Sequence, residues 1–521
     1  MNAESPDRRA VGSRPGQPAG GTAADISITA LQGMLVKLVA ATLDVPPDTI
    51  EVAKPLRGYG LDSLAAVTIT ADLEDWLGES IDPSLILEDP TIESIARFLI
   101  GQRRRRDTSL PEDTEVIVAE PYRFELFPEY LRLQQRFAEL ERLGVANPYF
   151  RLHDGVACDT VLVDNRQLIN FSSYNYLGMS GDAVVSEAAK LAIERYGTSV
   201  SASRLIGGEK SLHRELEAEL ASFLGTEDCI VYVSGHATNV ATIGHLLGPK
   251  DLIVHDAFIH NSIVQGSVLS RASRRSFPHN DWEALDALLS EMRSRHGRVL
   301  IAIEGVYSIH GDVPDLPYFI EIKKRHEALL MVDEAHSMGV LGRTGRGISE
   351  HFNVDPAEVD LWMGTLSKTF ASCGGFIAGC HALVEYLKYS APGFVYSVGM
   401  SPPNAAAALA AVRLLRAQPE RVTRLRARIQ YFHEAAKQRG LTTGPGRDSA
   451  VVPILVGDSV KCIVLSEALL RRGVNVMPVI PPVVESNAAT LRFFLTSSHT
   501  EDQIQRAVAA VAEELARLRE P

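Results

Sequence analysis

Cysteines are few in this sequence, and none of them form a paired motif. The five cysteines, an odd number, stand at positions 158, 229, 373, 380 and 462 of 521, and no two have CxxC spacing. A disulfide framework or a zinc site is therefore not expected. A reducing, cytoplasmic location is the simplest interpretation.

Excess positive charge and long apolar runs are also lacking. The formal net charge is −13, which gives no support for nucleic-acid binding. No apolar stretch reaches the roughly 18 residues of a membrane-spanning helix, so no membrane segment is expected. Residues 1–25 are rich in Gly, Pro, Ala and Ser and lack the apolar core of a signal peptide. We expect a disordered leader there.

Apolar residues at helical spacing predict an all-α bundle over residues 26–101. Leu31, Leu35 and Val39 fall on one face of the first predicted helix. A second helix is expected to follow Ser63. A third, short helix is expected in DPTIESIARFLIG, with Thr91 as its N-cap.

A change of composition follows this predicted bundle. Residues 102–125 carry a basic run, an acidic patch and a proline without periodicity, which predicts a linker. We interpret Arg103–Arg106 as a solvated tether rather than a docking patch. Residues 128–144 then have the spacing of an amphipathic helix, so a second domain is expected over residues 126–521.

Short apolar runs alternate with helical patterns from about residue 157 onwards. This alternation predicts an α/β fold with a mostly parallel sheet covered by helices on both faces. Strands are expected at residues 229–233, 251–256, 298–305, 328–336 and 360–368. Ligands collect at the carboxyl ends of such strands, so the polar residues just past them are site candidates. We expect the large domain over about 170–405 and a smaller α+β lobe over about 406–521.

A serine stands at a predicted helix start in the stretch GYGLDSL, although Asp62 beside it could already cap the helix. Gly58 and Gly60 keep its approach open, which suggests that the Ser63 hydroxyl is modified. At Gly60, Asp62, Ser63 and Leu64, and again in LEDPTIESIARFL, the segment resembles an acyl or peptidyl carrier protein. The resemblance implies that a phosphopantetheinyl transferase attaches 4′-phosphopantetheine to Ser63. The alternative is a capping serine in an unrelated bundle.

Lys368, in GTLSKTFASCGGF, follows a predicted strand and lies among apolar and small residues. A lysine there is costly unless it is neutralised or used, and one use is an imine with pyridoxal phosphate. Asp333, at a strand end, could pair with a pyridinium N–H or simply cap the strand. His336 could reach the phenolic oxygen of the cofactor or the substrate. Gly235 and His236, at a strand–helix turn, could bind phosphate.

Three further residues past predicted strands fit the same site. His260 could stack on a pyridine ring, and Ser308 could donate to the phenolic oxygen. The forked guanidinium of Arg492 suits an α-carboxylate. Taken singly, each of these residues also fits a structural role.

From about Phe150 onwards, several blocks together resemble the α-oxoamine synthases, a family of fold-type I pyridoxal-phosphate enzymes. The blocks are INFSSYNYLG, HDAFIHNS, EGVYSIHGD, VDEAHSMGVLGRTGRG, GTLSKTFASCGGF and LRFFLTSSHT. The resemblance implies that Lys368 is the Schiff-base lysine, Asp333 the pyridinium partner and His260 the ring-stacking residue. It also implies cofactor contacts from His336, Ser308 and Thr365 and substrate contacts from Asn175 and Arg492.

The segment PGFVYSVGMSPP resembles the part of the family that crosses to the other subunit. It implies a homodimer with shared sites and a cofactor contact from Ser397. The sequence departs from the family pattern at His236 and at Asn261, where the family commonly has an apolar or aromatic residue and an alanine. These departures leave the preference for amino acid and acyl group open.

The implied reaction is a decarboxylative Claisen-type condensation of an α-amino acid with an acyl thioester, giving an α-aminoketone. Its catalytic residues would be Lys368, His336, Asp333 and His260. The fused carrier suggests that Ser63 presents the acyl group in cis, supplied by an upstream synthase of polyketide-like secondary or antibiotic metabolism. The alternatives are an aminotransferase or racemase whose carrier only docks, and a carrier that loads the amino acid. Glycine, alanine and serine all stay open as substrates.

Overall fold

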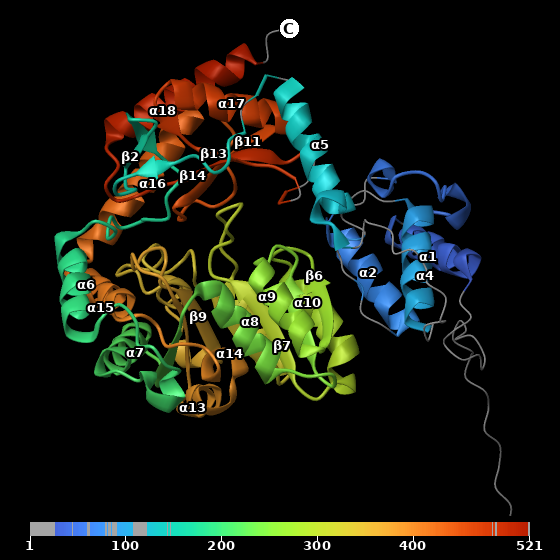
Figure 1. Ribbon diagram of the computed structural model, residues 1–521, viewed down its shortest axis with the longest axis horizontal. Coiled ribbons are helices and arrows are strands. Elements are labelled where there is room, and N and C mark those ends of the chain that lie inside the picture. Colours follow the sequence, from blue (N-terminus) through green and yellow to red (C-terminus); the bar gives the residue numbers. More distant parts are fainter. Residues whose placement is uncertain are drawn as a thin grey trace, which may run out of the picture. The chain divides into compact units, whose positions relative to one another are not determined.

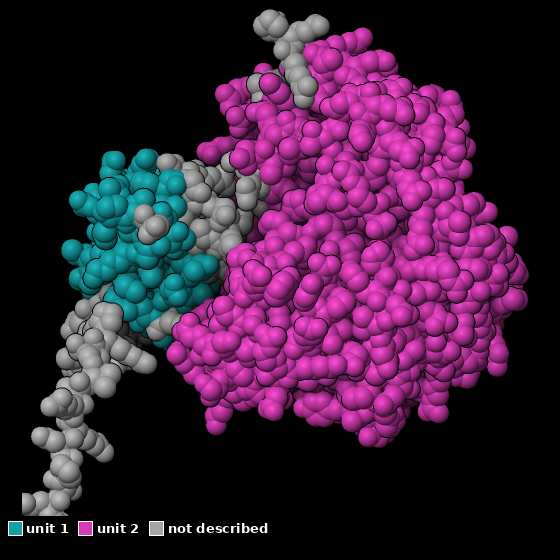
Figure 2. Space-filling view, turned by 180° about the vertical axis from the view of Figure 1, so that it is seen from behind, with its two compact units in different colours: residues 1–119 teal, residues 120–521 magenta. Residues whose placement is uncertain are grey.

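The chain forms two compact units, residues 1–119 and 120–521, which Figure 2 distinguishes by colour. This computed structural model describes residues 27–43, 45–59, 63–78, 81, 85, 91–107, 122–142, 144–145, 147–481, 483–484 and 487–518. The expected leader, residues Gly60 and Asp62, the Ser63 side chain and residues 108–121 of the expected linker lie outside the described part.

The first unit is the helical bundle that the sequence predicts. Its described helices are α1 (Ile28–Leu43), α2 (Ser63–Leu77) and α4 (Ile92–Asp107), with the short turns η1 (Pro47–Thr49) and η2 (Leu56–Tyr59). Apolar side chains at helical spacing pack together in its core, including Leu31, Leu35, Ile69, Leu73, Ile95 and Leu99.

The third helix has the expected cap but a different end. The Thr91 hydroxyl accepts the Ser94 N–H at 3.1 Å, and the Ser94 hydroxyl accepts the Thr91 N–H at 3.0 Å. This reciprocal pair confirms Thr91 as the N-cap. Helix α4 continues to Asp107, past the expected end at Gly101, because the arginines at 103–106 are good helix formers.

The second unit contains a seven-stranded sheet in its described part, in the order β4-β10-β9-β8-β7-β5-β6. The strands are β4 (Asp228–Tyr232), β5 (Leu252–Asp256), β6 (Ser273–Phe277), β7 (Val299–Glu304), β8 (Leu329–Asp333), β9 (Leu361–Thr365) and β10 (Gly375–Gly379). Strand β10 is antiparallel to both neighbours, and the others run parallel to one another. The predicted mostly parallel sheet is thus confirmed, with β6 and β10 added to the strands expected.

Both faces of this sheet are buried. Successive side chains along a strand point to opposite faces, and each face packs into its own apolar layer. Leu252 and Val254 join the larger core, whereas Ile253 between them joins the core on the other face. Helices α8, α9, α13 and α14 contribute to the core around Ile253, and α8 and α9 lie side by side in Figure 1. The helices of this part are α6 (Ala183–Tyr196), α7 (Ser211–Leu224), α8 (Gly235–Leu246), α9 (Asn261–Ser270), α10 (Trp282–Met292), α11 (Leu316–Arg325), α12 (Ile348–Phe352), α13 (His381–Ser390), α14 (Pro392–Val395) and α15 (Pro402–Ala417).

A smaller α+β lobe completes the second unit. Its strands β11 (Val451–Gly457), β14 (Ala489–Phe494) and β13 (Met477–Val479) form one sheet, and β1 (His153–Asp154), β2 (Thr160–Val163), β3 (Arg166–Asn170) and β12 (Val474–Asn475) form another. Its helices are α16 (Glu420–Gln438), α17 (Ser459–Arg471) and α18 (Glu501–Arg517). Strand β12 pairs in parallel with β3, so residues 153–170 also belong to this lobe, which the sequence did not predict. Figure 1 shows teal β2 among the orange and red elements of this lobe.

Helix α5 (Pro128–Arg142) occupies most of the expected amphipathic segment at the start of the second unit. The short turn η4 (Phe124–Leu126) precedes it, and none of its residues is fully buried. None of the described helices combines the length and the apolar character needed to cross a membrane.

Candidate active site

The carboxyl ends of neighbouring parallel strands bring several polar residues together. Glu304 ends β7 and lies in register with Asp333, which ends β8. Thr365 ends β9, and Lys368 follows three residues later. Lys368 lies within electrostatic range of both carboxyl groups, so the structure brings it to Asp333 as the sequence predicts.

The amine of Lys368 is held in a state that suits nucleophilic attack. The pKa of Lys368 is lowered to about 8, because burial and, to a smaller extent, Arg492 lower it by more than Asp333 and Glu304 raise it. Its Nζ atom lies 5.5 Å from the centre of the Tyr174 ring. An amine with this pKa is partly neutral near neutral pH and can attack an aldehyde carbon. Tyr174 was not predicted, although it lies in the SYNYLG block.

Two hydrogen bonds fix the carboxylate of buried Asp333. The Asn239 Nδ2 atom donates to Oδ2 at 2.9 Å, and the Ala335 N–H donates to Oδ1 at 2.9 Å. Asn239 was also missed from the sequence. Gly235 and Asn239 are four residues apart on α8, so they lie on the same face of the helix. This spacing from the predicted phosphate-binding turn was the sequence signal that could have identified Asn239. A carboxylate oriented in this way can pair with a ring N–H.

His336 is a neutral imidazole with a fixed orientation. Burial lowers the pKa of His336 well below its usual value, and the charges of Lys368 and Arg492 lower it further. Its Nδ1 atom lies 2.7 Å from the hydroxyl oxygen of Tyr176, which is itself buried. The Tyr174 ring meets the imidazole edge-on at 5.9 Å. The remaining nitrogen, Nε2, is left to exchange a proton or a hydrogen bond with a bound molecule.

The start of α8 forms a close-packed turn between β9 and β10. A Cβ atom added to Gly235 would lie 2.8 Å from Thr365 Oγ1. A Cβ atom added to Gly375 would lie 2.7 Å from the Cα atom of Gly235. Only glycine at both positions lets the helix start approach the sheet so closely. The Thr365 and Ser367 hydroxyls lie 2.8 Å apart beside it, and His236 is exposed. First-turn N–H groups beside hydroxyls suit a phosphate.

His260 stands at the start of α9, within electrostatic range of Asp333 and Lys368. Its Nδ1 atom accepts the Ser262 N–H at 3.2 Å and lies 2.7 Å from the Ser262 hydroxyl. Burial lowers the pKa of His260, Asp333 opposes this, and Lys368 adds to it. The imidazole is therefore a neutral ring whose plane is set by Ser262.

Arg492 reaches the site from the smaller lobe. Its Nη1 atom donates to the Ser308 carbonyl oxygen at 3.0 Å, and its Cζ atom lies 4.8 Å from the Phe494 ring centre. Its Nε atom is buried and has no hydrogen-bond partner among the described residues. A guanidinium with an unused donor suits a carboxylate ligand. The expected contact from the Ser308 hydroxyl stays a prediction.

Asn175 and Ser397 are engaged elsewhere. The Asn175 amide donates to the carbonyl oxygens of Ala157 and Ser180 at 3.2 Å each and accepts the Ser180 N–H at 3.1 Å. The Ser397 hydroxyl donates to the Val398 carbonyl at 3.3 Å, between α14 and α15. The expected substrate contact of Asn175 and the expected cofactor contact of Ser397 stay predictions.

Glu304 is an acidic residue of the site that was missed from the sequence. Burial raises the pKa of Glu304 well above its usual value, and the neighbouring Asp333 and Asp256 raise it further. Its Oε1 atom is buried without a hydrogen-bond partner in the described part of the chain. This shift favours the protonated form of Glu304, which can donate a hydrogen bond. Its position at the end of a predicted strand, directly before Gly305, was the sequence signal that could have identified Glu304 as a site residue.

These groups fit the expected pyridoxal phosphate by their chemistry. Asp333 suits the ring nitrogen, the Lys368 amine suits the aldehyde, and the start of α8 suits the phosphate. When bound, this cofactor supplies an electron sink for a carbanion. The expected cofactor contact of His336 and the expected substrate contact of Arg492 stay predictions.

Two family models match the chain. The model described as "Aminotransferase class I and II" matches residues 166–511, and the model described as "Phosphopantetheine attachment site" matches residues 35–99. The chain is 41% identical to the 8-amino-7-oxononanoate synthase of Geobacter sulfurreducens, over 72% of the chain and 96% of that protein. It is 37% identical to the 4-hydroxy-2,2'-bipyrrole-5-methanol synthase PigH of a Serratia species, over 68% of the chain and 54% of that protein.

A solved structure has the same fold. The Sphingomonas wittichii serine palmitoyltransferase superposes with a TM-score of 0.72 at 31% identity, covering 75% of this chain and 98% of that one.

Proposed function

The chain belongs to the α-oxoamine synthases of the class I and II aminotransferase family, and from this premise we propose that it condenses an α-amino acid with an acyl thioester carried on its own first unit. It is a C-acyltransferase, and its cofactors are pyridoxal phosphate and 4′-phosphopantetheine. The proposed product is an α-aminoketone, with carbon dioxide released.

One observation carries this proposal: a phosphopantetheine attachment site and an α-oxoamine synthase share one chain. The match to the Geobacter enzyme uses 96% of that protein but 72% of this chain, which leaves the carrier unit as the addition. A tethered acyl group reaches an effective concentration of about a millimolar, so a chain that carries its own donor gains over free thioester. Ser63, at the start of α2, would carry the arm.

The proposed roles follow from the charges and contacts of the site. Arg492 would bind the α-carboxylate through its guanidinium, whose Nε donor has no partner among the described residues. The Lys368 amine, with its pKa of about 8, would remove the proton from the α-carbon and later return one. The neutral His336 would hold an oxygen of the bound molecule through Nε2. Asp333 would keep the ring nitrogen protonated, so that the ring withdraws electrons from the α-carbon.

The wider setting of the reaction is also part of the proposal. The Serratia relative is named as the synthase of a bipyrrole methanol, which supports a place in secondary metabolism. An upstream synthase would load the acyl group, and a phosphopantetheinyl transferase would first modify Ser63. A homodimer is proposed from the family, with Ser397 contributing across the subunit boundary.

Intact-protein mass spectrometry tests the proposal directly. The full chain is treated with a phosphopantetheinyl transferase and an acyl donor, and then glycine, alanine or serine is added. We expect the mass of the loaded arm, its loss with one amino acid, and release of carbon dioxide. Transfer of the amino group without carbon dioxide would instead identify an aminotransferase and refute the proposal.

Two variants separate the steps. Ser63→Ala should bind pyridoxal phosphate normally but acquire no arm, so activity from loaded acyl groups should vanish. Lys368→Ala should load the acyl group normally and fail to release it. Full activity of Ser63→Ala under the same loading conditions would show that the carrier unit is not the donor.

A further inference from the structure

An imidazole is held between two carboxylates next to the active site. The His279 Nδ1 atom lies 2.8 Å from Asp256 Oδ1, and its Nε2 atom lies 2.6 Å from Asp312 Oδ2. The Asp256 side chain is fully buried, and the side chains of Asp312 and His279 are 13% and 20% exposed. A carboxylate at each ring nitrogen requires a proton on each, so this imidazole is a cation.

The two carboxylates belong to different parts of the active-site edge. Asp256 ends β5, four residues before His260. Asp312 closes the turn 307–312, in which the Tyr307 N–H donates to the Asp312 carbonyl at 3.1 Å and the Gly311 N–H donates to the Tyr307 carbonyl at 2.9 Å. Ser308 lies inside this turn. His279 therefore ties the turn to the end of the central sheet.

The same turn lies directly against the backbone of the smaller lobe. Gly311 has φ +72°, and an added Cβ would lie 2.0 Å from the Val451 carbonyl oxygen on β11. An added Cβ at Gly446 would lie 1.8 Å from the Gly311 carbonyl oxygen. Two backbones in contact leave no side chain between them that could adjust. A movement of the turn must therefore move β11.

Strand β11 carries this constraint to the substrate arginine. In the antiparallel pairing with β14, Pro453 of β11 is opposite Arg492. Arg492 also donates to the Ser308 carbonyl, inside the turn itself. The turn thus fixes Arg492 in two ways, through the strand that carries it and through its guanidinium.

We propose that His279 is a positioning residue that locks the turn 307–312 between the central sheet and the smaller lobe, and so sets where Arg492 meets an amino-acid carboxylate. This rests on the proposed function, which assigns that carboxylate to Arg492. The lock acts on amino-acid affinity more than on the binding of pyridoxal phosphate, because Lys368, Asp333 and the start of α8 lie outside the turn that His279 holds.

The surroundings of His279 keep it charged. The ionisable groups beside it in the described structure are Asp256 from β5 and Asp312, His310 and Tyr307 from the turn; Glu304 from β7 lies near Asp256 and Tyr307. Burial alone would lower the pKa of His279, but hydrogen bonds to Asp256 and Asp312 raise it to about 9. Burial lowers the pKa of His310, so His310 adds no competing cation at neutral pH.

The test uses full-length holoenzyme and three variants. His279→Gln removes the cation, and Asp312→Asn removes one carboxylate and covers the case in which the first variant does not fold. His326→Gln is the matched control, because His326 Nε2 lies 2.7 Å from a single carboxylate, Asp286, on α10. Amino-acid Kd is read from the visible absorbance of the bound cofactor, and cofactor Kd is measured separately.

We expect the amino-acid Kd to rise about tenfold or more in His279→Gln and Asp312→Asn, since a buried charge-assisted hydrogen bond is lost. The cofactor Kd should stay within about threefold in all variants. An amino-acid Kd in His279→Gln equal to that of His326→Gln would overturn the inference.

Hydrogen exchange separates this inference from the proposed function. If the wild-type protein binds none of the amino acids, the proposed function fails, and the lock is then judged by exchange alone. Faster exchange of the turn 307–312 and of β14 in His279→Gln, with no change in His326→Gln, supports the lock. Unchanged exchange in both variants overturns it.

Discussion

The amine of Lys368 should lose its proton far below the pH at which ordinary lysines do. Its pKa is about 8, against about 10.4 for a free lysine side chain. At pH 7 roughly one molecule in ten then carries a neutral amine, compared with roughly one in several thousand for an unperturbed lysine. The advantage in reactive amine is therefore on the order of a few hundredfold.

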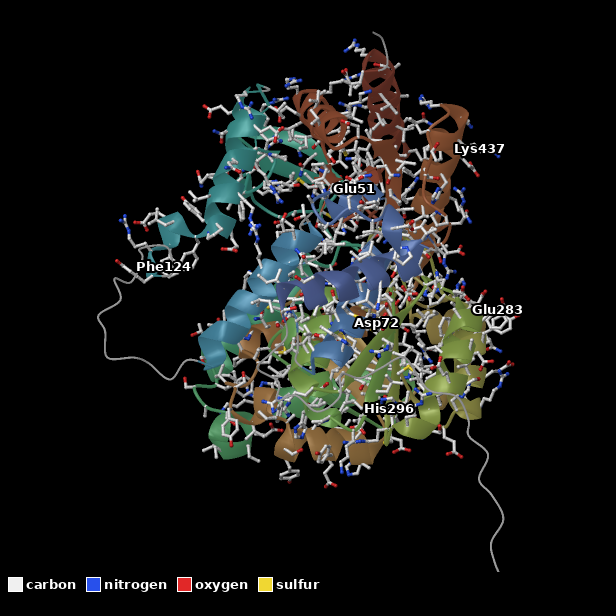
Figure 3. The ribbon with its side chains drawn as sticks, turned by 90° about the vertical axis from the view of Figure 1, so that its right-hand side faces the viewer. Glu51, Asp72, Phe124, Glu283, His296 and Lys437 are labelled. Atoms are coloured by element: carbon white, nitrogen blue, oxygen red, sulfur yellow. The ribbon has the colours of Figure 1, made fainter. Side chains whose placement is uncertain are left out.

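Brief labelling with an amine-reactive acylating reagent, followed by peptide mass spectrometry, measures this difference. The rate is followed from pH 6 to pH 10 in cofactor-free protein, and its midpoint is compared with the midpoint for Lys437. Lys437 projects from the last turn of α16 and is exposed (Figure 3). The midpoint is the useful quantity because partial burial of Lys368 slows the reagent at every pH alike.

Two substitutions should move this midpoint in opposite directions. Asp333→Asn removes a negative charge that raises the pKa of Lys368, so the midpoint should fall. Arg492→Gln removes a positive charge that lowers it, so the midpoint should rise. A wild-type midpoint for Lys368 no lower than that of Lys437, or shifts of the wrong sign, would refute the electrostatic reasoning.

Three further outcomes are expected. Gly375→Ala should weaken binding of pyridoxal phosphate about tenfold in a fluorescence titration, because its Cβ would lie 2.7 Å from Gly235 Cα and displace the start of α8. Tyr176→Phe leaves the buried His336 Nδ1 without its partner at 2.7 Å, so kcat should fall about tenfold or more while cofactor Kd is unchanged. His279, with its pKa raised to about 9, should add about 3 kcal/mol of stability below pH 6.5 that is lost as the pH rises to 9. Unfolding temperatures measured across this range should fall in the wild type and stay flatter in His279→Gln.

The sheet and the place of the site could be predicted because they follow from local patterns. Apolar runs such as residues 251–256 give strands buried on both faces, and the carboxyl ends of parallel strands share one edge. Lys368 and Asp333 were predicted as site residues in this way, whereas Thr365 was predicted only through the family resemblance. Strand β6 was missed because four of its five residues are only partly buried and two are arginines, and β10 because it begins and ends with glycine.

Other parts of the site depend on contacts between distant segments. Asn239 lies within an ordinary helical pattern, and only the fold brings its amide to Asp333, 94 positions away. Strand β3, early in the second unit, pairs with β12, about 300 residues later. Neither segment has a sequence pattern that indicates this pairing. Such residues cannot be recognised from sequence alone. A polar side chain within a helix gives the same sequence pattern whether it faces solvent or bonds to a residue at a strand end.

The position of Arg492 illustrates the same limit at the level of the backbone. Its residue type and its isolation among apolar neighbours predict a carboxylate binder, yet its location depends on a carbonyl oxygen 184 residues earlier. That carbonyl belongs to the turn 307–312, whose Gly311 backbone contacts β11 directly. His279 binds Asp312 of the same turn. Because His279 and Gly311 are not placed at the amino acid in the proposed complex, we expect amino-acid affinity to respond to residues that do not touch the amino acid. Under the proposed function, amino-acid preference would depend on how the two lobes are joined as well as on the pocket itself.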